Sequence, residues 1–176
     1  MKKSKYLVLN SFYFDFNDDL TEITNVKELF KKQNILDLHR FDILKNIERF
    51  AFKENQIKQL KLPQTIENIN NFVFENNQIK QLRLTKNIKI IDAYAFESNK
   101  IKILDLSNCV KLKKIKWCAF SINPLKEIKI LGNIEIEYED YYKKDMWNEF
   151  VIYYNDNNKK AGNYKLENNE WKWYPL

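Results

Sequence analysis

Apolar side chains recur along the chain with a period of 22 to 24 residues. In each copy a Phe is followed three positions later by Asn, two positions after that by Ile or Leu, and then by two apolar residues that alternate with polar ones. The Phe of the four copies stands at Phe52, Phe74, Phe96 and Phe120, and an incomplete copy at 34–47 precedes them. A repeat of this length predicts a solenoid in which each copy forms one coil.

The alternating segment of each copy predicts one short β-strand per repeat. In such a strand Leu60 and Leu62 lie on one face, and Lys61 lies on the other. The repeat is too short for a strand and a full crossover helix, so we expect the chain to return through turns or single-turn helical pieces. Stacked coils then place the strands in a parallel ladder, with equivalent residues about 5 Å apart.

Two further stripes follow the same spacing. The Phe stripe is expected to fill the core by aromatic packing. The Asn stripe comprises Asn55, Asn77, Asn99 and Asn123 and lies where the chain enters each strand. A buried carboxamide there can bond to backbone groups of its own and the adjacent coil, so we interpret the stripe as structural, with a binding role as the alternative.

Both ends of a solenoid need caps, because the terminal coils would otherwise expose apolar surface and unpaired strand edges. We expect an N-terminal cap at 1–33, with a strand at 6–16 and a helical turn at 25–30, and about four to five coils at 34–134. Residues 135–176 are predicted to form a β-rich cap, in which 150–154 and 163–166 make a β-hairpin and Gly162 relieves its turn.

Aromatic residues are concentrated in this C-terminal region. We expect them to seal the last coil, and the alternative is that some of the rings form an exposed stacking platform. The set comprises Trp147, Phe150, Tyr153, Trp171 and Trp173.

The repeated unit A-F-x-x-N-x-[IL]-x-x-[LI]-x-[LI], followed by I-x-x-I, resembles the BspA-like leucine-rich repeats. The resemblance covers roughly residues 34–134, and the tail from Trp147 resembles a cap that often follows such repeats in bacterial members. It implies a leucine-rich-repeat solenoid of short parallel strands with a C-terminal β-hairpin cap. It also implies a surface or secreted protein that binds matrix proteins, host proteins or other cells.

Composition and charge change this picture little. An apolar share of 44% excludes a disordered chain. With two Gly and three Pro, the turn positions that need positive φ are expected to be filled mostly by Asn. The net charge of +6 arises from 30 basic and 24 acidic residues that are interleaved, so long-range attraction of anions is expected to be weak.

No motif for catalysis, metal binding or a cofactor occurs, so we expect neither an enzyme nor a cofactor. Cys109 and Cys118 stand where other copies carry apolar residues and are predicted to be buried, unreactive thiols. His39 is expected on the surface, and the acidic stretch from Glu135 alternates like a half-exposed strand. The apolar run Tyr6–Leu9 is too short for a signal peptide, and no segment is expected to insert into a membrane.

The variable positions between the strand leucines predict a face that recognises a protein partner. We expect Ile103 to be its apolar anchor and Arg83 its charged anchor, and a merely solvated face is the alternative. One column comprises Gln59, Gln81, Ile103 and Glu127, and a second comprises Asp37, Lys61, Arg83, Asp105 and Lys129. Thr85 and Ser107 are expected to extend a third column.

One lysine per coil forms a separate column, namely Lys58, Lys80, Lys102 and Lys126. Like charges about 5 Å apart in water repel by roughly 0.8 kcal/mol, so solvated lysines explain the column without a ligand. The alternative hypothesis is a polyanion, either a glycan or a nucleic acid, that lies along this edge and releases counterions. A purely structural spacer is the remaining alternative.

Overall fold

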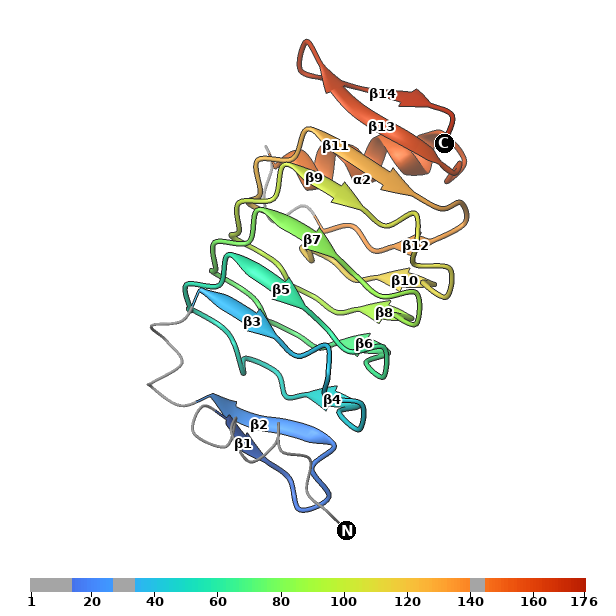
Figure 1. Cartoon of the computed structure of the whole chain (residues 1–176). Coiled ribbons are helices and arrows are strands. Elements are labelled where there is room, and N and C mark those ends of the chain that lie inside the picture. The colour runs from blue at the N-terminus through green and yellow to red at the C-terminus, as the bar shows by residue number, and fades with distance from the viewer. Residues whose placement is uncertain (1–13, 27–33, 140–144) are drawn as a thin grey trace.

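The computed structural model describes residues 14–26, 34–139 and 145–176. Successive coils are stacked into a solenoid that runs from the N-terminal strands to a C-terminal hairpin (Figure 1). Each coil has three sides: a strand of the large sheet, a shorter strand, and a turn that carries the repeated Phe and Asn. The fold is therefore the predicted leucine-rich-repeat solenoid of short parallel strands.

The large sheet has seven strands and forms one long side of the solenoid. Its strands are β3 (Ile35–Asp37), β5 (Gln59–Lys61), β7 (Gln81–Arg83), β9 (Ile103–Asp105), β11 (Glu127–Ile130), β13 (Gly162–Glu167) and β14 (Glu170–Tyr174). The strands from β3 to β11 are parallel, and the register sets Leu82 beside Leu104 and Leu104 beside Ile128. All three side chains are buried, which confirms the predicted alternation.

Short strands form a second side and make two smaller sheets. One contains β1 (Phe14–Phe16), β2 (Glu22–Val26) and β4 (Asn46–Ile47), and the other contains β6 (Asn68–Ile69), β8 (Ile90–Ile91), β10 (Lys114–Ile115) and β12 (Glu135–Ile136). The prediction of one strand per repeat therefore missed a second strand in each coil. Two residues, of which one Ile points inward, are too few to produce a recognisable alternation in the sequence.

On the third side, backbone hydrogen bonds alternate between a coil and its neighbour. The N–H groups of Phe50, Phe52 and Glu54 donate to carbonyls of the next coil at 3.3, 3.0 and 2.9 Å, whereas those of Ala51 and Lys53 donate within their own turn. The equivalent turn occurs in four successive coils, and in each of them two residues have positive φ. The pairs are Phe50 and Glu54, Phe72 and Asn76, Tyr94 and Ser98, and Cys118 and Ile122. The expectation that Asn fills most such positions is wrong, because the bonds between coils impose this backbone whatever the side chain.

Aromatic stacks line both surfaces of these turns. Inside, the rings of Phe52, Phe74, Phe96 and Phe120 are stacked in sequence. Their centroids lie 5.7, 5.3 and 5.4 Å apart, and each side chain is fully buried. Outside, the Phe72 ring stacks between Phe50 and Tyr94 at 4.8 and 4.6 Å. The predicted Phe stripe is thus confirmed as core.

Helix α2 (Met146–Asp156) closes the last coil, so the strand predicted at 150–154 is wrong. Trp147, Phe150, Val151 and Tyr154 are fully buried, and their spacing is that of an amphipathic helix. The Trp147 ring lies 5.0 Å from that of Phe120, the last ring of the inner stack. Sealing of the last coil is therefore confirmed for Trp147 and Phe150, and also for Trp171, which is buried against Phe150.

The C-terminal hairpin exists, but it joins β13 to β14. Its two-residue turn consists of Asn168 and Asn169, whose φ angles of 51° and 64° match the turn type that suits twisted antiparallel strands. Gly162 lies in β13 with negative φ, so its predicted role in a turn is wrong. A Cβ there would come within 2.0 Å of the Trp173 indole nitrogen, and this close approach requires glycine.

At the N-terminal end, β2 pairs antiparallel with β1 and parallel with β4. Phe14 of β1 packs against Phe52 with centroids 5.6 Å apart, which covers the first ring of the inner stack. Asn25 and Val26 belong to β2, so the helical turn predicted at 25–30 is wrong for these two residues. Residues 27–30, and 6–13 of the predicted strand, lie outside the described residues.

Adjacent residues Leu82 and Arg83 provide a direct test of this architecture. Leu82→Ala should lower the free energy of unfolding by about 2 to 5 kcal/mol, because it truncates a side chain that is 2% exposed. Arg83→Ala should change it by less than about 0.5 kcal/mol, because Arg83 lies on the outward face. Chemical denaturation of both variants measures the difference, and equal losses would contradict the assigned faces.

Candidate recognition face

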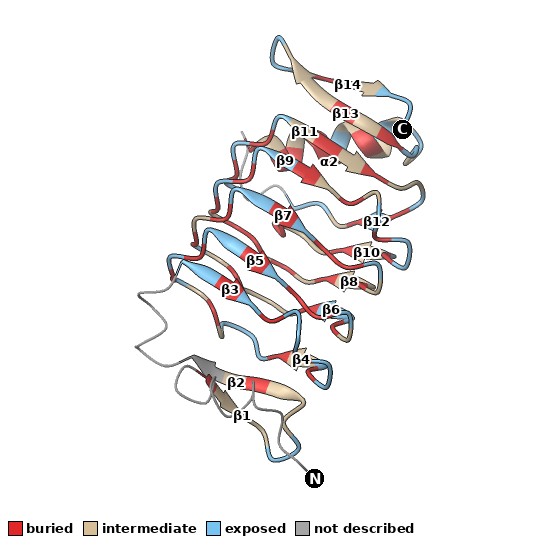
Figure 2. Cartoon of the chain, viewed as in Figure 1, coloured by how far each residue is buried: buried red, intermediate tan, exposed pale blue. Residues whose placement is uncertain are grey.

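The predicted partner-binding residues lie on the outward face of the seven-stranded sheet. The register of neighbouring strands aligns Gln59 with Gln81, Gln81 with Ile103, and Arg83 with Asp105. Figure 2 shows the exposed ends of β3, β5 and β7 on either side of a buried centre. Towards the C-terminus, Asp105, Glu127 and Lys129 are only half-buried. The residues singled out in the sequence thus share one surface.

A second exposed apolar residue, Ile35, lies on this face and was not predicted from the repeat pattern. Ile35 is the register partner of Gln59 and is 51% exposed, similar to Ile103 at 52%. Aligning the incomplete copy with the full repeats would have found it, because Ile35 occupies the position of Gln59. The face therefore carries one exposed Ile on β3 and another on β9.

The predicted third column is wrong for Thr85, which is buried. Ser107 is half-buried, and its hydroxyl donates to an Asp105 carboxylate oxygen at 2.6 Å. Because Thr85 is buried and Ser107 is half-buried, these positions do not extend the exposed face. The face consequently has two columns.

Charged residues on the face differ in whether they are paired. Lys61 Nζ lies 3.0 Å from a carboxylate oxygen of Asp37. Burial raises the pKa of Asp37, but hydrogen bonds from His39 and Lys61 outweigh burial and hold it below its ordinary value, so this carboxylate is ionised at neutral pH. Arg83 has no ion pair within the described part of the chain.

Between β5 and β7 the face is hollowed into a groove of about 830 Å³. Strands β5 and β7 are paired at one residue position only, Gln59 with Gln81. By contrast, the β3–β5 pair and the β7–β9 pair each contain three paired positions. The groove is lined by Lys58, Gln59, Leu60, Lys61, Leu62, Gln64, Lys80, Gln81, Arg83, Leu84 and Thr85. It thus joins two residues of the lysine column to four residues of the partner-binding columns.

A second hollow of about 420 Å³ adjoins the groove on the side of β9. It shares Gln81, Arg83 and Leu84 with the groove and reaches Ile103 and Asp105. Both predicted anchor residues, Arg83 and Ile103, therefore line hollowed parts of the face.

All four residues of the lysine column are exposed. None of them has an ion pair in the regions that the structure describes. Lysines on the short-strand side behave differently, since Lys89 lies 2.6 Å from Glu67 and Lys116 lies 2.6 Å from Asp92. The lysine column is therefore a line of exposed cations without ion pairs to described residues along one edge of the large sheet.

The groups with reactive chemistry are placed as the sequence suggested. Burial raises the pKa of Cys109 and of Cys118 to about 11, so both thiols stay protonated at neutral pH. His39 is exposed and contacts Asp37 and Arg40. Within residues 14–26, 34–139 and 145–176, no group of three or more His, Cys, Asp or Glu side chains could hold a metal ion.

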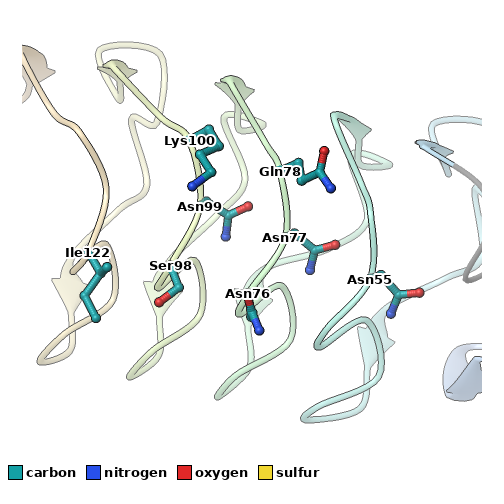
Figure 3. Close-up of a pocket in the computed structure, with 8 residues that line it drawn as sticks. All are labelled: Asn55, Asn76, Asn77, Gln78, Ser98, Asn99, Lys100 and Ile122. Atoms are coloured by element: carbon teal, nitrogen blue, oxygen red, sulfur yellow. The ribbon is translucent and has the colours of Figure 1, made fainter.

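The Asn stripe forms a ladder that joins the coils. Figure 3 shows Asn55, Asn77 and Asn99 at equivalent places on successive coils, beside a hollow of about 330 Å³. Asn99 Oδ1 accepts from the N–H of Ile79 at 3.0 Å in the preceding coil, and its Nδ2 donates to the carbonyl of Phe74 at 2.8 Å. Asn77 and Asn123 repeat this pattern, which confirms the structural interpretation for these three residues. Asn55 differs, since its Nδ2 donates to the Lys53 carbonyl of its own coil at 3.0 Å.

Comparison with known proteins identifies the repeat. A family model described as the BspA type leucine rich repeat region matches residues 21–147 in six copies. Members of this family are commonly repeat modules for protein interaction and are generally non-catalytic. They are often surface or secreted proteins. No curated protein and no solved structure matches the chain. No helix among the described residues has the length and apolar character needed to cross a membrane.

The Asn ladder predicts that a single carboxamide has a large effect on stability. Asn99→Ala should lower the free energy of unfolding by about 2 to 3 kcal/mol, because it leaves the Ile79 N–H buried without a partner and removes one of the two carboxamide donors to the Phe74 carbonyl. Asn108→Ala, at an exposed turn position, should cost less than about 0.5 kcal/mol. Thermal and urea denaturation measure both, and a loss at Asn99 no larger than that at Asn108 would refute the role of the ladder.

Proposed function

The chain belongs to the BspA-type leucine-rich repeat family, and on this premise we propose that it is a non-catalytic recognition module that binds a protein partner through the outward face of its seven-stranded sheet. The proposed contact residues are the two columns defined above. Arg83 and Ile103 serve as the charged and apolar anchors. The family placement supports a role in adhesion or recognition at the cell surface or outside the cell.

One observation carries this proposal: exposed side chains are held in register on a rigid sheet and surround hollowed surface. Ile103 is 52% exposed although its neighbours Leu104 and Ile101 are fully buried. Arg83 is exposed on the adjacent strand and lines both hollows. A fixed backbone loses little further conformational entropy on binding, and Arg is among the residue types that contribute most to interface energy.

The absence of catalysis is part of the proposal. The two thiols are buried with raised pKa values, and His39 contacts only surface neighbours among the described residues. A nucleophile needs an adjacent base and an accessible position, and these groups do not provide that arrangement.

The lysine column supports a second candidate, the binding of a polyanion such as a sulfated glycan. Its four side chains are exposed and have no ion pair in the described regions. A linear anion that followed the column would release counterions from each lysine, and this binding would weaken as salt rises. If neither partner exists, the domain acts as a structural spacer.

For the recognition face, the double variant Arg83→Glu with Ile103→Asp should weaken capture of a protein partner at least about tenfold, because it reverses one anchor charge and places a carboxylate on the apolar anchor. Lys86→Glu with Val110→Asp is the matched control, since both residues are exposed in turns outside the two columns. Partners recovered by pull-down from extracellular-matrix and cell extracts are compared by quantitative binding. If both double variants retain the partner equally, the face is not the contact surface.

For the polyanion, a heparin column provides the test. Lys80→Gln with Lys102→Gln should lower the salt concentration at elution if the lysine column binds, because two phosphate- or sulfate-neutralising charges are lost. Lys111→Gln with Lys113→Gln removes the same charge from exposed positions outside the column. Weak retention that is the same for the three proteins would exclude the second candidate.

A further inference from the structure

We propose that the groove between β5 and β7 binds a short extended segment of a protein partner that carries two acidic side chains. This inference rests on the proposed function and deepens it, because it names the chemistry of the partner and the part of the face that contacts it.

The charges that line the groove are of one sign. Four cations line it, and no carboxylate does so among the described residues. Lys58, Lys80 and Arg83 have no ion pair in the described regions, whereas Lys61 forms an ion pair with Asp37 on the neighbouring strand β3. A hollow with apolar walls and one sign of charge concentrates the electrostatic potential, so an anionic ligand is favoured there.

The four cations occupy both ends of the groove. Lys58 and Lys80 precede β5 and β7, whereas Lys61 and Arg83 end these strands. Three residues of extended chain separate the two ends, which is about 10 Å. In an extended polyproline-II segment, residues three apart project from the same side at about 9 Å, so two acidic residues with this spacing can each reach one pair of cations.

The middle of the groove suits a peptide. Gln59 and Gln81 lie between the charged ends, and their carboxamides can donate to and accept from a peptide backbone. The floor is apolar, since the side chains of Leu60, Leu62 and Leu84 line the groove. Apolar side chains of a peptide can cover this floor.

The surroundings of the groove favour a peptide over a polyanion. On the sheet face the positive region spans only β5 and β7, about 10 Å, because Asp37 lies on one side and Asp105 on the other. Glu127 follows on β11. A glycan or nucleic acid that followed the column of Lys61 and Arg83 along the solenoid would meet Asp37 and Asp105, whereas a peptide of a few residues fits between them.

Fluorescence anisotropy with the full chain tests this proposal. The probe is a labelled nine-residue peptide of Gly, Ser and Leu with two Glu residues three positions apart, and its control has Gln at both positions. The Glu peptide should bind at least about tenfold more tightly than the Gln peptide and should weaken as salt rises. Equal affinity of the two peptides, or no binding of either, would overturn the proposal.

Two double variants locate the site. Lys80→Gln with Arg83→Gln removes two charges from the groove and should weaken the Glu peptide about tenfold or more. Lys102→Gln with Lys126→Gln removes the same charge from the lysine column outside the groove and should change affinity less than about twofold. Circular dichroism checks that both variants keep their fold. An equal loss of peptide affinity in the two double variants would overturn the proposal. So would a heparin tetrasaccharide that binds more tightly than the Glu peptide and is weakened by both double variants, which would indicate a polyanion along the lysine column.

This result is separable from that of the proposed function. If the acidic peptide does not bind but Arg83→Glu with Ile103→Asp still loses its protein partner, the recognition face stands and the acidic segment is wrong. If that double variant keeps its protein partner, the outward face is not the contact surface, whether or not the acidic peptide binds.

Discussion

The fold depends on the buried hydrogen bonds that an Asn side chain makes to the backbone of the preceding coil. At Asn77, Asn99 and Asn123 the same carboxamide accepts from an Ile N–H and donates to a Phe carbonyl in that coil. These backbone groups are buried at a turn, where no strand partner is available, so leaving them unpaired would cost about 1 to 3 kcal/mol each. These hydrogen bonds therefore fix the position of each coil relative to the preceding one. With the coils held in this alignment, the Phe rings stack and the inward leucines lie side by side.

The same constraint determines what the outward face can present. Since the coils cannot slip, residues between the inward leucines stand in columns, and charge differences along a column become fixed features of the surface. The short-strand side carries ion pairs between coils, such as Lys89 with Glu67 and Lys116 with Asp92. The large sheet leaves Arg83 and the lysine column without such pairs in the described regions. A stable scaffold whose outward face carries cations without ion pairs to any described residue is consistent with a module that recognises another macromolecule.

Features that repeat were predictable from the sequence, and features that arise where the repeat ends or bends were not. The inward leucines, the Phe core and the bonding of the Asn stripe all follow from a position recurring in every coil. Helix α2 was missed because Phe150 and Tyr154 were read as strand residues, although Trp147 and Val151 complete a helical spacing. Positive φ at Phe50 and Phe72 was not predictable from residue preference, because bonds between coils impose it. The groove was missed because β5 and β7 have nearly identical sequences, and nothing in them signals a hollow between the two strands.

Native-state hydrogen exchange measures the central interaction directly, because the amides of Ile57, Ile79 and Ile101 each donate to an Asn oxygen of the next coil. The account predicts that these three amides exchange only through unfolding of whole coils, with protection equal to that of the Leu38 and Leu106 amides, which bond between coils of the large sheet. Exchange of the three Ile amides at rates typical of exposed turns, while Leu38 and Leu106 stayed protected, would contradict it.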